Sequence, residues 1–157
     1  MIDTDYKLLD SQLHALLDGE RDPLAATANF VALLYNALEE INWLGVYVLR
    51  DDELVLGPFQ GKPACVHIAL DEGVCGLAAT TRETQRVADV HAFPGHIVCD
   101  ADSRSELVVP LIVHDQLIGV LDIDSPITRR FNPTDQAGVE NLCETFCAMQ
   151  ESRKYFI

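Results

Sequence analysis

Apolar side chains recur at helical spacing in four segments of the chain. Asp22 and Pro23 supply a helix start, because aspartate caps a first turn and proline suits the first helical position. Asn132 and Pro133 open another helix, and Gly19 supplies a stop. The pattern therefore predicts helices at residues 5–18, 23 to about 40, 74–81 and 135 to about 153.

Continuous apolar runs between turn residues predict strands. Polar stretches at residues 50–53 and 114–116 each separate two such runs, which is typical of β-hairpins. Hairpins imply antiparallel pairing, and the helices flank the strands instead of alternating with each one. We therefore predict an α+β fold with a central antiparallel sheet flanked by helices. The strands are expected at residues 43–49, 54–56, 64–69, 107–113 and 117–123.

Residues 87–105 are polar and show little periodicity. A long polar loop within a compact domain is uncommon and is often functional. We therefore expect this loop to contribute to a site. The sequence leaves open whether its section from Asp89 to Arg104 closes over a substrate.

The length and charge exclude several classes of protein. The 157 residues fit a single domain, expected at 1–157, and are enough to bury a core. Eleven Lys and Arg against 25 Asp and Glu give a formal net charge of −14, which counts against nucleic acid and anionic membranes as partners. No apolar run approaches the roughly 20 residues of a membrane span. The first residues carry no secretory signal, so we expect a cytoplasmic protein.

The chain holds five cysteines, an odd number that does not suit a secreted disulfide framework. Cys65 lies in a predicted strand, Cys75 at the start of a predicted helix and Cys99 in the polar loop. Together these thiols suggest redox chemistry, in which one becomes a sulfenic acid and a second converts it to a disulfide. Cys143 and Cys147 lie one helical turn apart beside apolar residues, so we expect them to be packed.

The residues themselves leave the reactive thiol and a metal site open. Cys75 stands at a helix entrance, where amide N–H groups and the helix dipole favour a thiolate. Around Cys99, acidic and basic neighbours act on the thiol pKa in opposite directions. The cysteines lack the short spacing of structural zinc sites, although a mixed site with His67 or His96 fits the sequence.

Three acids stand at the ends of predicted strands. Glu106 begins the strand after the polar loop, and Asp122 and Asp124 end the next one. Because side chains alternate along a strand, Asp122 and Asp124 share one face and can place charge at the mouth of a site. The alternative is that they cap the turn before Ser125 and Pro126.

Five short segments follow one another between Trp43 and Phe131. They are GPFQGKPAC at 57–65, GVCG at 73–76, VHAFPGHIVCD at 90–100, SRSE at 103–106 and GVLDIDS at 119–125. In this order they resemble the free methionine-(R)-sulfoxide reductases, which are GAF-domain enzymes, and the segment around Cys99 is especially specific to that family. His67 and Val98 depart from its usual residues, at positions that take no part in the chemistry.

The resemblance implies reduction of free methionine (R)-sulfoxide without a metal or an organic cofactor. The family's nucleophile matches Cys99, which the resemblance favours over Cys75. Its resolving thiols match Cys65 and Cys75, with no order between them. The resemblance also implies that thioredoxin reduces the resulting disulfide and that the protein is a homodimer.

The resemblance assigns substrate binding to one aromatic and three acidic residues, Trp43, Glu106, Asp122 and Asp124. The resemblance implies that Trp43 contacts the methyl group of the substrate. We expect one carboxyl to protonate the sulfoxide oxygen and the others to hold the ammonium. The alternative is a non-catalytic GAF domain that senses a small ligand or redox state. It is disfavoured because the chain has no room for an output module.

Overall fold

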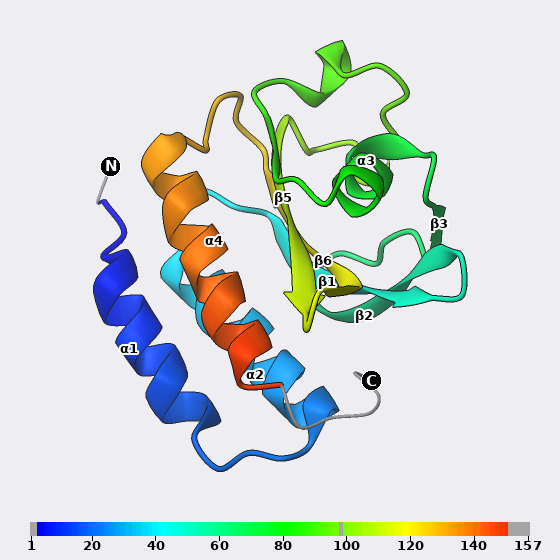
Figure 1. Cartoon of the computed structure of the whole chain (residues 1–157). Helices are drawn as coiled ribbons and strands as arrows, with labels where there is room; N and C mark the ends of the chain where they lie inside the picture. Colours follow the sequence, from blue (N-terminus) through cyan, green and yellow to red (C-terminus); the bar gives the residue numbers. More distant parts are fainter. Residues whose placement is uncertain (1–2, 98, 151–157) are drawn as a thin grey trace.

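A curled antiparallel sheet with helices on both faces forms the protein (Figure 1). The structure is a computed structural model that describes residues 3–97 and 99–150. Its strands run in the order β3-β2-β1-β6-β5-β4, and the predicted α+β class is confirmed. The elements are α1 (Tyr6–Leu17), α2 (Pro23–Ala37), β1 (Trp43–Arg50), β2 (Glu53–Gly61), β3 (His67–Ala69), α3 (Gly73–Thr81), β4 (Gln85–Val87), the short 3-10 helix η1 (Val90–Ala92), β5 (Ser105–Val113), β6 (Gln116–Ser125) and α4 (Pro133–Ala148).

Different elements cover the two faces of the sheet. The long helices α1, α2 and α4 lie on one side, and α3 lies on the other (Figure 1). Strand alternation divides β6 accordingly, since Leu121 and Ile123 pack in the helix-side core while Val120 packs towards α3. The helix-side core is the larger of the two. The polar groups on the α3 side therefore lie on a sheet whose opposite face is well packed by helices.

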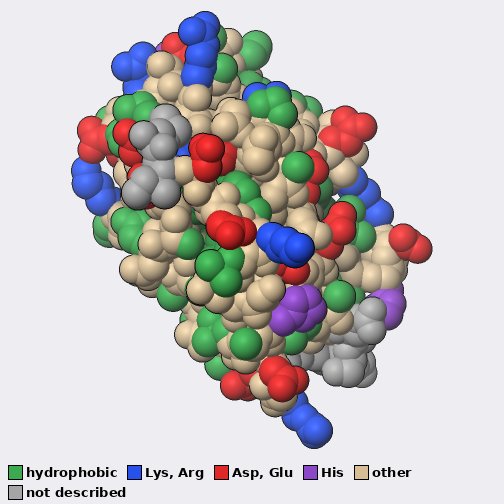
Figure 2. All heavy atoms as spheres, turned by 90° about the vertical axis from the view of Figure 1, so that its left-hand side faces the viewer, with side chains coloured by type: hydrophobic (Ala, Val, Ile, Leu, Met, Phe, Trp, Pro, Cys, Tyr) green, Lys and Arg blue, Asp and Glu red, His purple; other side chains and the backbone are tan. Residues whose placement is uncertain are grey.

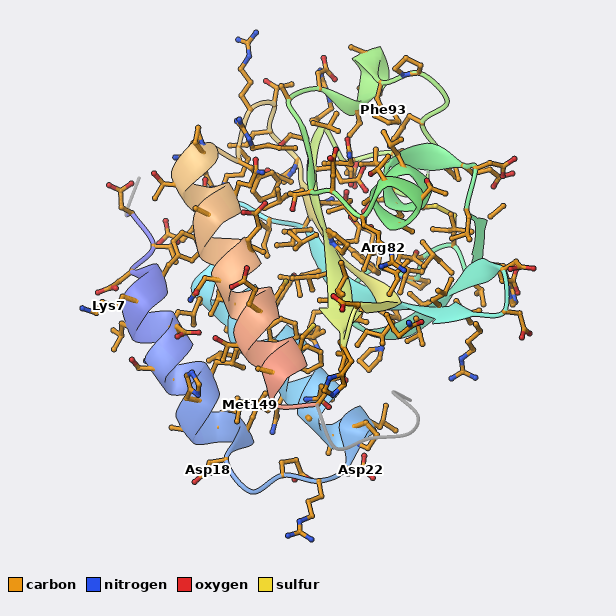
Figure 3. The ribbon with its side chains drawn as sticks, in the orientation of Figure 1. Lys7, Asp18, Asp22, Arg82, Phe93 and Met149 are labelled. Atoms are coloured by element: carbon orange, nitrogen blue, oxygen red, sulfur yellow. A yellow bond between two sulfur atoms is a disulfide. The ribbon has the colours of Figure 1, made fainter. Side chains whose placement is uncertain are left out.

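The predicted helix starts at Asp22 and Asn132 are confirmed as N-caps. The Asp22 carboxylate accepts a hydrogen bond from the Ala25 amide at 2.9 Å, near the α1–α2 turn that Asp18 and Asp22 flank in Figure 3. Asn132 and Asp135 form a capping box at the start of α4. The last helix ends at Ala148. Its expected end near residue 153 lies outside the described residues.

Two predicted strand boundaries are wrong. We expected β2 to stop at Leu56, but it continues to Gly61. A bulge opposite Val46 absorbs Gly57 and Pro58, which looked like a strand end in the sequence. The strand expected at residues 64–69 is shorter, β3 beginning only at His67. Cys65 therefore lies in the connection before β3 and not within a strand.

The polar segment 87–105 contains more structure than its sequence indicates. Strand β4 ends at Val87, the first residue of the segment, and the single turn η1 follows it; both elements are too short to show periodicity. The Val90 amide donates to the Arg104 carbonyl at 2.8 Å, which closes the base of the loop. Phe93 lies at the end of the molecule opposite the α1–α2 turn (Figure 3). The remainder, residues 93–104, has no regular element within its described part and extends over the α3 side.

The surface mixes charged and apolar side chains. On the face shown in Figure 2, acidic and basic groups are interspersed with apolar ones. Within the described ranges, no helix is long and apolar enough to cross a membrane.

Gly45 allows the Trp43 indole to lie against the sheet. A Cβ at Gly45 would collide with the Trp43 ring and would lie 2.5 Å from Cβ of Phe59. The indole stacks with Phe59 and Tyr47, with ring centroids 5.4 and 5.8 Å apart. The absence of a side chain at Gly45 thus sets the place of the aromatic group.

Gly45→Ala is expected to lower the free energy of unfolding by about 1–3 kcal/mol, because the added methyl overpacks this contact. Urea unfolding measures the change. Gly95→Ala is the control, since φ there is +74° and no described heavy atom would lie within 4 Å of the new Cβ. This control is expected to lose only about 1–2 kcal/mol, because alanine is less stable than glycine in a left-handed conformation. Full retention of stability in Gly45→Ala would contradict the proposed contact.

Candidate active site

Three adjacent strands carry an aromatic and three acidic side chains to the α3 side of the sheet. Trp43 in β1 pairs with Asp124 in β6, and Asp124 pairs in turn with Glu106 in β5. Asp122 precedes Asp124 by two residues and points to the same side. All four residues line one pocket. The expectation that Asp122 and Asp124 share a face is therefore confirmed.

The turn after β6 is held by Ser125 and not by these aspartates. The Ser125 hydroxyl donates to the Glu40 carbonyl at 2.6 Å and accepts a hydrogen bond from the Ile127 amide at 3.2 Å. Asp122 and Asp124 are thus left to face the pocket.

The pocket measures about 540 Å³ out to its open mouth. The sheet forms its floor, and the start of α3 and the polar loop form further walls. Gly73 adopts a left-handed conformation at the start of α3, with a φ of +64°. A Cβ there would lie 3.3 Å from the Ile97 side chain, so the loop and the helix approach each other closely. The walls are made by Pro63, Ala64, Ile68, Glu72, Gly73, Val74, Cys75, His96, Ile97, Cys99, Asp100 and Ser103.

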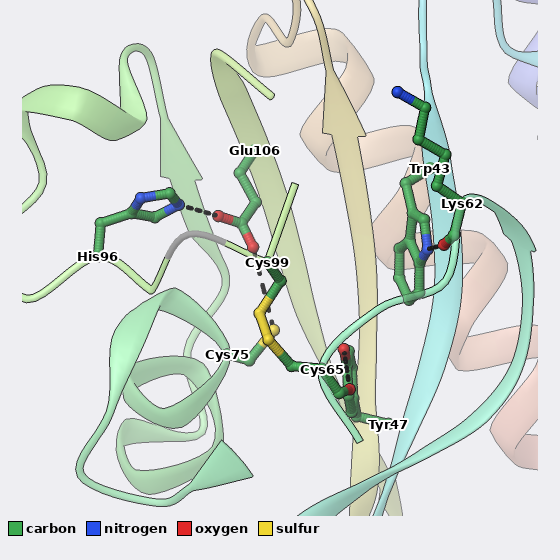
Figure 4. The surroundings of a disulfide bond; sticks show 8 residues. All are labelled: Trp43, Tyr47, Lys62, Cys65, Cys75, His96, Cys99 and Glu106. Carbon is green, nitrogen blue, oxygen red and sulfur yellow. Dashed lines mark hydrogen bonds and ion pairs between the residues drawn. A yellow bond between two sulfur atoms is a disulfide. The ribbon is translucent and has the colours of Figure 1, made fainter. Parts of the chain in front are cut away.

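Cys65 and Cys99 are joined by a disulfide at the pocket wall (Figure 4), with their Cα atoms 5.5 Å apart. Cys75 is a free thiol and is buried in α3. The structure therefore brings together all three cysteines that we singled out in the centre of the chain. It also distinguishes them, since two form a bond and one does not.

Hydrogen bonds hold both ends of this disulfide in place. The Tyr47 hydroxyl donates to the Cys65 carbonyl at 2.9 Å. On the other side, the Asn42 amide group donates to the Asp100 carboxylate at 3.2 Å. An ion pair of 2.7 Å between Lys62 and the Asp102 carboxylate links the two loops at the surface. The two sulfur-bearing segments are thus attached to β1 and to each other.

The expectation that Cys75, at a helix start, favours a thiolate is wrong. Burial raises the pKa of Cys75 well above its ordinary value, and the nearby Asp122, Glu106 and Asp124 carboxylates raise the pKa further. Its Sγ lies 4.0 Å from Oε1 of Glu106. The helix start does favour a thiolate, but desolvation and neighbouring negative charge outweigh it. These acids lie in β5 and β6, far from Cys75 in the sequence, so the local sequence around Cys75 does not indicate them.

The pKa values of all three acids are raised, mainly because the carboxyls are buried. Burial is the largest cause of the raised pKa of Glu106, Asp122 and Asp124, and the charge of Asp122 adds to the shift at the other two. One oxygen of Asp122, Oδ1, is buried without a hydrogen-bond partner among the described residues. Nε2 of His96 lies 4.0 Å from Oε2 of Glu106 (Figure 4). Such a cluster can hold protons or bind a positively charged group.

Sequence reasoning missed one residue of this site and misplaced another. Tyr47 lines the pocket, and its spacing of four residues from Trp43 on one strand was a usable signal. His96 was considered as a possible metal ligand and for its effect on Cys99, yet its ring lies beside Glu106. Only the folding of the loop onto β5 reveals that contact.

The remaining candidates lie elsewhere or have other partners. Cys143 and Cys147 belong to the helix-side core, which confirms that they are packed. Nδ1 of His67 lies 2.9 Å from Oε1 of Glu53 on the exposed side of β2, so His67 pairs with an acid and not with Cys65. Three potential metal ligands, Cys75, Glu106 and Asp122, do converge in the pocket, with one ligand atom of each within 4.8 Å of the others.

Comparisons with known proteins agree on a family. The GAF domain model matches residues 27–146. The chain is 51% identical over 154 residues to the free methionine-R-sulfoxide reductase of Escherichia coli, a match that covers 96% of this chain and 93% of that protein. It is 43% identical to the Saccharomyces cerevisiae protein of the same name, covering 82% and 76% of the two chains. The structure of fRMsr of Staphylococcus aureus in complex with substrate matches with a TM-score of 0.91 and 49% identity, covering 96% and 98%.

The raised pKa of Glu106 predicts a pH-dependent stability. Because the folded protein holds this proton more tightly than the unfolded chain does, the free energy of unfolding falls as pH rises above 4.5, the ordinary carboxyl pKa, towards the raised one. Glu106→Gln removes the cost of ionisation. We expect it to match the wild type near pH 4 and to be more stable than the wild type at pH 8.

Chemical unfolding of both proteins across this pH range measures the effect. Glu83→Gln, at an exposed position, is the matched control and is expected to parallel the wild type. Parallel curves for Glu106→Gln and the wild type would contradict the raised pKa.

Proposed function

Because this chain belongs to the free methionine-R-sulfoxide reductases, a family of enzymes built on the GAF domain, we propose that its pocket binds free methionine (R)-sulfoxide and reduces it at Cys99. Membership of the family supports the reductase activity. One observation carries the assignment of residues, which is the disulfide between Cys65 and Cys99 at the wall of a pocket lined by buried acids.

Cys99 supplies the nucleophile. Its sulfur attacks the sulfur of the substrate, and the sulfoxide oxygen takes up a proton and is transferred to Cys99. Methionine leaves, and Cys99 remains as a sulfenic acid. The sulfoxide sulfur is thereby reduced and the cysteine sulfur oxidised by the same pair of electrons.

A carboxyl of the cluster formed by Glu106, Asp122 and Asp124 supplies the proton. An acid can donate a proton near neutral pH only if its pKa is raised, and burial raises the pKa of all three groups. The ionised members of the cluster hold the ammonium of the substrate. Both roles need acids that are close together and shielded from water, as these are.

The start of α3 and the Trp43 ring bind the other ends of the amino acid. The first amide N–H groups of a helix have no acceptor within it. Glu72 precedes α3 without forming a side-chain cap in the described part of the chain, so the amides of Gly73 and its successors can hold the substrate carboxylate. The indole of Trp43 offers an apolar surface to the methyl group. A free amino acid thus pairs its ammonium with the acids and its carboxylate with the α3 amides. A methionine residue within a protein lacks both charged groups.

Cys65 converts the sulfenic acid to a disulfide. Its thiol attacks the Cys99 sulfur, the disulfide forms and the oxygen leaves as water. The pairing of Cys65 with Cys99 supports Cys65 over Cys75, and so does the raised pKa of the buried Cys75 thiol. A dithiol protein, thioredoxin, then returns two electrons and two protons to the disulfide. We further propose that the enzyme acts as a cytoplasmic homodimer without a cofactor.

Substitution of the two bonded cysteines separates their roles. Cys99→Ser is expected to reduce methionine formation to background, since no nucleophile remains. Cys65→Ser is expected to release one methionine per chain and then stop, because the sulfenic acid has no partner. Amino-acid analysis after incubation with methionine (R)-sulfoxide and thioredoxin measures both. Cys143→Ala, in the opposite core, controls for the loss of a thiol.

Two outcomes would contradict these assignments. Sustained turnover by Cys65→Ser would transfer the resolving role to Cys75. Binding of the sulfoxide by the wild type without any methionine formation would favour the alternative, a ligand sensor.

The preference for a free amino acid can be tested on the substrate side. N-acetylation removes the ammonium and leaves buried carboxylates unpaired, so kcat/KM is expected to fall by roughly 10⁴ relative to methionine (R)-sulfoxide. Asp124→Asn weakens that interaction and is expected to narrow the difference between the two substrates. Equal kcat/KM values for both substrates in the wild type would show that the acids do not hold the ammonium.

A further inference from the structure

Cys75 is the one pocket thiol for which the proposed chemistry has no use. It stays a free thiol while Cys65 and Cys99 are bonded. Its side chain reaches the pocket, where it lies 4.0 Å from Oε1 of Glu106. A packing role alone does not explain why a sulfur faces carboxylates, because apolar neighbours suit a structural cysteine better.

Three potential ligands converge at this point from three separate elements. Cys75 comes from α3, Glu106 from β5 and Asp122 from β6. One ligand atom of each lies within 4.8 Å of the other two, and all three residues are buried. A tetrahedral ion at ordinary ligand distances of about 2.0–2.3 Å holds its ligand atoms roughly 3.3–3.5 Å apart, so binding would draw these side chains closer together.

An unpaired oxygen of Asp122 is a second observation that points to a bound ligand here. The residue is only 6% exposed, and its Oδ1 atom has no hydrogen-bond partner within the described ranges. A buried acceptor without a partner costs free energy that a bound cation or donor removes. Asp122, Cys75 and Glu106 all line the same pocket.

We propose that Cys75, Glu106 and Asp122 form a binding site for a thiophilic divalent cation such as Zn²⁺. Sulfur and carboxylate oxygen are both established zinc ligands, and thiolate disfavours the hard ions Mg²⁺ and Ca²⁺. On binding, the Cys75 thiol loses its proton to solvent and its sulfur lone pair bonds to the ion. No electron is transferred, because zinc has no redox chemistry in proteins. Three protein ligands leave a further position of the ion open to the pocket.

Such an ion would inhibit the enzyme. It needs the same carboxylates that hold the substrate ammonium, and this consequence rests on the proposed function. The site itself does not, because its ligands remain in place when the disulfide is formed and no turnover is possible. Binding can therefore be measured on the oxidised protein without substrate or reductant.

The test uses Co²⁺, which occupies zinc sites and reports thiolate ligation as a charge-transfer absorption in the near ultraviolet. In the oxidised protein, Cys65 and Cys99 are blocked by their own bond. We expect one Co²⁺ to bind per chain with this absorption, and Zn²⁺ to displace it. Cys75→Ala is expected to lose the absorption. Cys143→Ala is the matched control and is expected to keep it, because Cys143 lies in the core on the other side of the sheet.

Glu106→Gln provides a second variant that leaves the thiol in place. It is expected to retain the absorption and to bind Co²⁺ at least about tenfold more weakly, since a carboxylate ligand becomes a neutral amide. The proposal is overturned if the wild type shows no thiolate absorption, if Cys75→Ala keeps it, or if Glu106→Gln binds Co²⁺ as tightly as the wild type.

Discussion

The burial of Glu106, Asp122 and Asp124 side by side is the constraint on which the site depends. In a pocket with little water, ionised carboxyls are costly and repel one another, so each additional negative charge is resisted. The cluster can relieve this cost by keeping protons, by pairing with an ammonium or by binding a metal ion. One unfavourable feature of the fold therefore underlies both roles that we propose for the acids, proton donation and recognition of an amino acid.

The helix-covered face of the sheet contributes most of the apolar core, and the α3 face carries the acid cluster. Leu107, Leu121 and Ile123 point away from the pocket and are completely buried against α1, α2 and α4. The same strands carry the acids on their opposite side. Burial on the helix side offsets the cost of the acid cluster, as expected where a functional site is less stable than its scaffold. The α3 side contributes a helix start and a loop, which adapt more readily to a ligand.

Prediction from sequence succeeded where short-range periodicity decided the outcome. The four helices, the two hairpins, the shared face of Asp122 and Asp124 and the packed state of Cys143 all follow from spacing along the chain. It failed where distant residues decided. Gly57 and Pro58 looked like a strand end until a bulge opposite Val46 accommodated them. The pKa of Cys75 looked lowered until acids from two other strands surrounded its thiol.

From the amino-acid order alone follow the α+β class, the candidate cysteines and acids, and the family that their motifs resemble. These are properties of residue identity and local spacing. Only the folded chain decides which thiol pairs with Cys99, because Cys65 reaches it through a connection that Tyr47 anchors to the sheet. Only the folded chain makes the acids basic enough to hold protons. Desolvation and charge repulsion depend on distance in space, and strand register sets that distance.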